Sequence, residues 1–88
     1  MRTAMIINKR GLHARAAAKL AKVVSGFNAE VSVSKCGQTV SGQSIMGLMM
    51  LAAAQGSEIT LKASGPDQDR ALEALCTLIN DRFGEDIA

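Results

Sequence analysis

The sequence predicts an α+β fold, an open-faced two-layer sandwich in which three helices cover one face of a four-stranded antiparallel sheet. Residues 29–35 and 58–64 alternate apolar and polar side chains, as half-buried strands do. Residues 14–24 and 68–83 instead carry apolar side chains at spacings of three and four, which is typical of amphipathic helices. At 88 residues, we expect one domain spanning 1–88.

The first half of the chain is expected to form a strand, a helix and a hairpin. Residues 2–8 are an apolar strand, which ends at Lys9-Arg10-Gly11. Residues 14–24 lack Gly and Pro and are rich in Ala, the best helix former, and Gly26 is placed to end this helix. Strand 29–35 turns at 36–38 into a short returning strand, 39–41.

The second half is expected to add a helix, a strand and a last helix, which gives the order β-α-β-β-α-β-α. Ser44 is a suitable N-cap for a short helix at 45–51. Strand 58–64 follows, and then the turn Gly65-Pro66-Asp67, where Asp67 can cap the longest helix, 68–83. Gly84 is expected to stop that helix, and the acidic tail 85–88 is expected to fray.

Composition excludes several function classes. Ten basic and eight acidic residues give a net charge of only +2, and without a basic run or stacking aromatics we expect no nucleic-acid binding. Two cysteines, Cys36 and Cys76, match neither a disulfide framework nor a zinc motif, so we expect free thiols. One histidine and two distant cysteines do not make a metal site, and we expect neither a metal nor a cofactor. No signal-peptide pattern and no long apolar run occur, so we expect a cytoplasmic protein without membrane insertion.

His13, the only histidine, follows Gly11-Leu12 at the expected N-cap of the first helix, two residues before Arg15. A helix N-terminus attracts anions, and a neutral imidazole can act as a nucleophile. We therefore hypothesise that His13 takes up a phosphoryl group and passes it on, with Arg15 stabilising it. The plainer alternative is a histidine that only caps a helix or lies on the surface. A hydrolase is disfavoured, because no second acid or base is adjacent to His13.

The short helix at 45–51 carries more large apolar side chains than it can bury. Leu48 and Leu51 can face inward, but Ile45, Met46 and Met49 cannot all do so. We expect an exposed apolar patch there, and methionine is typical of adaptable binding surfaces. The alternative is that these side chains pack under a neighbouring loop.

Two motifs together resemble one protein family. The stretch Gly11-Leu12-His13-Ala14-Arg15, before an alanine-rich helix, resembles the active-site stretch of HPr-type phosphocarriers of the phosphoenolpyruvate-dependent phosphotransferase system. Residues 42–49 are similar to the regulatory-serine helix of that family, and 55–65 to its last strand and turn. The resemblance covers essentially the whole chain.

The resemblance implies a function and a set of partners. His13 would accept a phosphoryl group on Nδ1 from phosphorylated enzyme I and donate it to a histidine of a IIA-type protein. Arg15 would stabilise that group, and Ser44 would be the target of an HPr kinase/phosphorylase, although capping alone also explains a serine there. The docking surface implied for the partners comprises Ala14, Ala18, Ile45, Met46 and Met49. We expect a monomer.

Two points qualify the resemblance. Family members usually carry Pro after the active-site Arg, whereas this chain has Ala16, which should loosen the start of the helix slightly. The Asn8-Lys9 pair and the ending Phe83-Gly84-Glu85-Asp86 look similar to the nitrogen-related branch. Ser44 and its helix instead look similar to the kinase-regulated carbohydrate branch. The main alternative function is a non-catalytic regulatory module that acts through the Ser44 helix.

Overall fold

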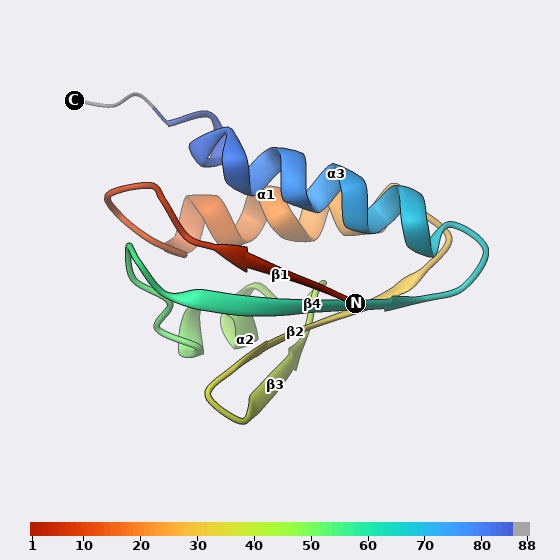
Figure 1. Cartoon of the computed structure of the whole chain (residues 1–88), viewed down its shortest axis with the longest axis horizontal. Coiled ribbons are helices and arrows are strands. Elements are labelled where there is room, and N and C mark those ends of the chain that lie inside the picture. The colour runs from red at the N-terminus through yellow and green to blue at the C-terminus, as the bar shows by residue number, and fades with distance from the viewer. Residues whose placement is uncertain (86–88) are drawn as a thin grey trace.

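The computed structural model describes residues 1–85 and has the predicted architecture. Its elements are the strands β1 (Arg2–Met5), β2 (Glu30–Lys35), β3 (Gln38–Ser41) and β4 (Glu58–Ser64), the helices α1 (Ala14–Ser25), α2 (Ile45–Met50) and α3 (Gln68–Asn80), and a 3₁₀ turn, η1 (Arg82–Gly84). The sheet has the order β1-β4-β2-β3, and every neighbouring pair is antiparallel. Helices α1 and α3 lie side by side across one face of it (Figure 1).

The core lies between this sheet and the helices and is almost entirely aliphatic. The inward residues of the alternating strands are buried, as Val31 and Val33 in β2 and Ile59 and Leu61 in β4 show. The helices bury residues three or four positions apart on one stripe each, which is the pattern that their sequences predict. Phe83, which is fully buried, is the one aromatic side chain in the buried core of the described residues.

The long C-terminal helix ends earlier than the sequence predicts. Helix α3 stops at Asn80, and the chain turns back through Arg82, Phe83 and Gly84, whose φ angles are 54°, 55° and 73°. Three successive left-handed residues cannot continue a right-handed helix. This reversal places Phe83 in the core and sends Glu85 back towards the start of α1. The predicted frayed tail is therefore wrong for Glu85, and residues 86–88 lie outside the described part.

The predicted helix caps are correct in one case and wrong in another. The Ser44 hydroxyl accepts a hydrogen bond from the Gly47 N–H at 3.0 Å and caps α2 as expected. Asp67 occupies the N-cap position of α3, but its carboxylate makes no cap bond there. It instead accepts a hydrogen bond from the Asn28 N–H at 2.8 Å, which ties the β4–α3 turn to the start of β2.

The loop before α1 is fixed by close backbone packing. Gly11 has a φ of 66°, and a Cβ there would overlap the Ala53 carbonyl oxygen and stand 2.8 Å from the Ala54 Cα. The Leu12 N–H donates to that same Ala53 carbonyl at 2.8 Å. Only glycine allows both the conformation and the approach, so the loop that carries His13 is tied to the segment after α2.

Gly11→Ala should lower the free energy of unfolding by about 2–5 kcal/mol, the sum of left-handed strain and backbone overlap. Gly37→Ala is the matched control, because Gly37 also has a positive φ, 82°, but nothing within 4 Å of a Cβ. The control should lose only about 1–2 kcal/mol. Urea unfolding measures both losses, and equal losses would contradict the close packing of Gly11.

Candidate functional site

His13 lies at the N-cap of α1, but its imidazole does not cap the helix. Its side chain makes no cap bond to the helix, and the first helical bond runs from the Ala17 N–H to the His13 carbonyl at 2.8 Å. The N–H groups of the first turn before Ala17 therefore have no acceptor within the helix. These N–H groups and the positive end of the helix dipole form a favourable environment for an anion beside His13.

Arg15 stands in the same first turn and is exposed. Among residues 1–85 it makes no hydrogen bond or ion pair, so its guanidinium is available to a bound group. A guanidinium offers a planar fork of N–H donors that matches the oxygens of a phosphoryl group. The structure thus brings the two predicted site residues together at one helix end.

The sequence reasoning missed a carboxylate at this site. The Glu85 Oε2 pairs with the His13 Nε2, and the two side chains are 17% and 23% exposed. The expectation that no acid lies next to His13 is therefore wrong, because the reversal at η1 brings one from 72 residues further along the chain. No local sequence pattern marks Glu85, since its position depends on the fold of the whole C-terminal turn.

Asn8 is a third side chain of this site, and it hydrogen-bonds to Glu85. It is the one buried polar residue of residues 1–85, at 1% exposure. Its amide nitrogen donates to the Gly11 carbonyl at 2.8 Å and to the Glu85 Oε1 at 2.9 Å. Its Oδ1 has no hydrogen-bond partner in the described protein. One buried side chain therefore links the loop before His13 to the carboxylate that contacts His13.

These contacts set the charge of Glu85. Burial raises the pKa of the Glu85 carboxyl, but the hydrogen bonds from His13 and Asn8, together with the charges of His13 and Arg10, outweigh burial and leave the pKa below its usual value. Glu85 is therefore a carboxylate at neutral pH, held against the imidazole.

Helix α2 carries the exposed apolar patch. Ile45, Met46 and Met49 are all exposed, Met46 at 70%. Met50, which the sequence reasoning did not include, is also exposed, and its spacing of four residues from Met46 could have predicted this. Ala14 and Ala18 are exposed on α1, and α1 packs against α2. Leu48 and Leu51 are buried, as predicted.

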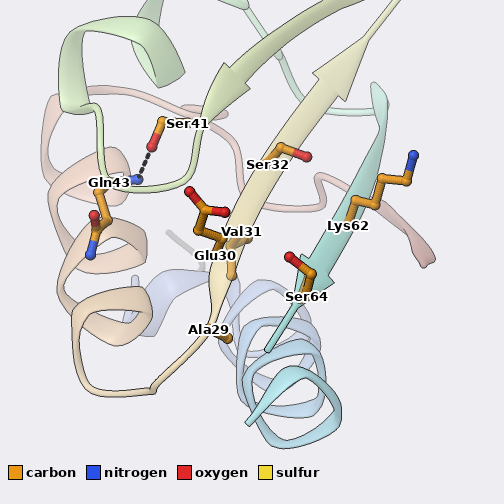
Figure 2. Close-up of a pocket in the computed structure, with 9 residues that line it drawn as sticks. Ala29, Glu30, Val31, Ser32, Ser41, Gln43, Lys62 and Ser64 are labelled. Atoms are coloured by element: carbon orange, nitrogen blue, oxygen red, sulfur yellow. Dashed lines mark hydrogen bonds between the residues drawn. The ribbon is translucent and has the colours of Figure 1, made fainter. Parts of the chain in front are cut away.

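A cavity of about 460 Å³ lies elsewhere, on the exposed face of the sheet (Figure 2). Its polar lining comes from Glu30, Ser32, Ser41, Gln43, Lys62 and Ser64. The Ser41 hydroxyl accepts a hydrogen bond from the Gln43 N–H at 3.2 Å, and both residues line the cavity. The cavity is lined by neither His13 nor Arg15, so it is not part of the site at the start of α1.

Two further features of the described residues concern metal binding and membrane insertion. Within residues 1–85 no cluster of three or more His, Cys, Asp or Glu side chains could hold a metal ion. None of the described helices is long and apolar enough to cross a membrane. Both cysteines are free thiols; Cys36 is exposed in the β2–β3 turn and Cys76 is half-buried in α3.

Comparison with known proteins gives matches along most of the chain. Residues 1–81 match the family model described as "PTS HPr component phosphorylation site". Among curated relatives, the phosphocarrier protein HPr of Cupriavidus necator is 52% identical over 96% of this chain and 94% of its own length. The phosphocarrier protein NPr of Shewanella violacea is 45% identical, over 96% and 92%.

Solved structures show the same fold. HPr from Thermoanaerobacter tengcongensis superimposes with a TM-score of 0.93 at 42% identity, covering 98% of this chain and 97% of that one. Crh, the catabolite repression containing protein of Bacillus subtilis, gives a TM-score of 0.76 at 38% identity, covering 93% of this chain and 94% of that one. The architecture predicted from the sequence is therefore that of known HPr structures.

The contact between Glu85 and His13 should make stability depend on pH. Because the pKa of Glu85 is lower in the folded protein than its reference of 4.5, the contact stabilises the fold above that pH and is lost as pH falls through the folded-state value. Glu85→Gln should therefore lower the melting temperature at pH 6–7, and the difference from the parent should shrink below about pH 4. Thermal melts across that range measure it.

Glu73→Gln is the control, since Glu73 is an exposed acid on α3 that contacts no part of the site. It should shift the melting temperature little at any pH. A Glu85→Gln difference that stays constant down to pH 3 would show that the carboxylate charge does not contribute.

Proposed function

This chain belongs to the HPr family of phosphotransferase-system phosphocarriers, and on that premise we propose that His13 is the residue that accepts and releases the phosphoryl group. The observation that carries the proposal is the placement of the chain's only histidine. It stands at the N-cap of α1 and is partly exposed, and its imidazole makes no cap bond. A phosphocarrier needs a nucleophile that two different partner proteins can reach in turn.

The surrounding groups suit a phosphoryl group that is held only briefly. Its oxygens can accept from the free N–H groups of the first turn of α1 and from Arg15. No lid or closed pocket surrounds the described site, because Ala14 and Arg15 next to His13 are exposed. Stabilisation by surface groups alone keeps the adduct accessible for onward transfer. No metal or other cofactor is required by this chemistry.

For partners, we propose phosphorylated enzyme I as the donor, charged by phosphoenolpyruvate, and a histidine of a IIA-type protein as the acceptor. Both would dock in the cytoplasm on the exposed residues of α1 and α2, namely Ala14, Ala18, Ile45, Met46 and Met49, to which the structure adds Met50. Flexible methionine side chains suit a surface that must fit two partners of different shape.

Ser44 is proposed as a regulatory phosphorylation site for an HPr kinase/phosphorylase. Its hydroxyl oxygen already accepts from the Gly47 N–H, and phosphate oxygens could keep that role at the N-terminus of α2. The added negative charge would lie next to Ile45 and Met46, where it would weaken apolar docking.

The relatives of this chain carry both the HPr and the NPr names. The two branches would differ in the protein that accepts the phosphoryl group, which would be a sugar-type or a nitrogen-type IIA protein.

Incubation with phosphoenolpyruvate and enzyme I should add one phosphoryl group, about 80 Da, to the chain. The adduct should be acid-labile and absent in His13→Ala, as intact-mass spectrometry can show. Arg15→Ala should retain the adduct but form it more slowly. An adduct that persists in His13→Ala would overturn the assignment, and a phenotype untouched by His13→Ala would favour the non-catalytic regulatory module.

Met46→Ala should slow phosphorylation by enzyme I, because Met46 is the most exposed apolar side chain of α2. Loss of a central apolar contact at an interface costs on the order of 1–2 kcal/mol, or about a tenfold rise in the KM for the carrier. Met5→Ala is the matched control, because Met5 is 52% exposed but lies on β1, at the sheet edge away from α2. Equal effects of the two variants would contradict docking on α2.

A further inference from the structure

The C-terminal turn holds a carboxylate against one particular nitrogen of His13. The Glu85 Oε2 contacts the Nε2 and not the Nδ1. A carboxylate without a proton can only accept a hydrogen bond, so the Nε2 must carry a proton in this contact. In a neutral imidazole the other nitrogen then has the free electron pair. The partner at Nε2 thus decides which nitrogen is the nucleophile.

Glu85 is anchored from several sides. The Asn8 amide holds its other oxygen at 2.9 Å, so the two carboxylate oxygens have different fixed partners. The residue two positions earlier, Phe83, is fully buried, and Lys19 of α1 donates to the Phe83 carbonyl at 2.6 Å. The intervening Gly84 takes a φ of 73°, which turns the chain back over the start of α1. The carboxylate is therefore positioned by the fold and is not a chance surface contact.

Asn8 is a buried polar side chain, and apolar packing does not explain an amide at this position. It is buried, yet both of its donated hydrogen bonds go to groups that flank His13, one to Gly11 and one to Glu85. Its Oδ1 receives nothing from the described protein, so the side chain is anchored only through these two bonds. A buried amide used in this manner links the loop that carries His13 to the carboxylate that orients it.

We propose that Glu85, held by Asn8, is a positioning residue that keeps the proton of neutral His13 on Nε2 and so makes Nδ1 the phosphoryl acceptor. This inference rests on the proposed function of His13. During transfer the Nδ1 electron pair forms the new N–P bond, and the pair of the broken P–N bond returns to the donor histidine. The His13 ring keeps its Nε2 proton and becomes positively charged, and Glu85 faces that charge.

The same contact serves the transfer in both directions. The Glu85 carboxylate stabilises the cationic ring of the adduct on the side away from the phosphoryl group, while Arg15 and the helix N–H groups receive the phosphoryl oxygens. When the group leaves for an acceptor, the electron pair of the N–P bond returns to Nδ1, and the ring is again neutral with its proton on Nε2. No proton has to move between the two nitrogens in either step.

The test compares the parent with Glu85→Ala and Asn8→Leu, using the full chain with ¹⁵N-labelled histidine. Nitrogen chemical shifts, measured where the imidazole is neutral, report which ring nitrogen carries the proton. We expect the parent to be protonated almost wholly on Nε2, and both variants to show a mixture of the two forms. The rate of phosphorylation by enzyme I should fall about tenfold in Glu85→Ala, the order expected for one charge-assisted hydrogen bond.

Glu73→Ala removes an equal charge from an exposed site and should change neither the tautomer nor the rate. Because Asn8 acts through Glu85, the double variant should have the same tautomer mixture as Glu85→Ala alone. If the parent protein is phosphorylated normally and Glu85→Ala keeps the same tautomer and the same rate, the positioning role is overturned. The proposed function then remains intact. A parent that is never phosphorylated would instead overturn the proposed function.

Discussion

The backbone contact between the loop before α1 and the segment after α2 is the constraint on which the site depends. Gly11 approaches Ala53 and Ala54 so closely that no side chain fits, and the Leu12 N–H donates to the Ala53 carbonyl. That segment is itself fixed, because Lys35 of β2 donates to the carbonyls of Leu51 and Ala52 at 3.2 and 3.1 Å. The proposed phosphoryl site and the proposed docking helix are thus connected through contacts that reach strand β2, so the structure fixes where His13 lies relative to α2.

A carboxylate next to the proposed phosphoryl site is an apparent conflict, since a carboxylate and a phosphoryl group are both anionic. The imidazole ring resolves it by separating them, because Glu85 contacts Nε2 on one side and the Nδ1 faces elsewhere. A phosphorylated ring that keeps its Nε2 proton is cationic, so the carboxylate faces a positive charge and the phosphoryl group faces the donors of the helix end. The arrangement follows the principle of a carboxylate that orients a catalytic histidine, here supplied by the C-terminal turn.

How far the sequence predicted these features depended on the range of the interactions involved. Strand Glu58–Ser64 was predicted to the residue, because its alternation is local and its ends are marked by turn residues. The end of α3 was missed, because Arg82 and Phe83 adopt left-handed conformations that their residue types do not favour. Asp67 failed as a cap because Asn28, 39 residues away, binds its carboxylate. Glu85 was missed for the same reason, since its partners Asn8 and His13 lie at the other end of the chain.

Ala16, where the family usually has Pro, shows how tertiary contacts replace a local restraint. A proline in the first turn would fix one φ angle and so stiffen the helix start. Here the small Ala16 side chain is fully buried in the core, and its neighbours are held by the Leu12–Ala53 bond before the helix and the Ala17–His13 bond within it. The Lys19 contact to Phe83 adds a further tie one turn later. The start of α1 is therefore held by contacts with two distant segments, the one after α2 and the C-terminal turn. The orientation of His13 depends on these contacts more than on the conformational preference of any single residue beside it.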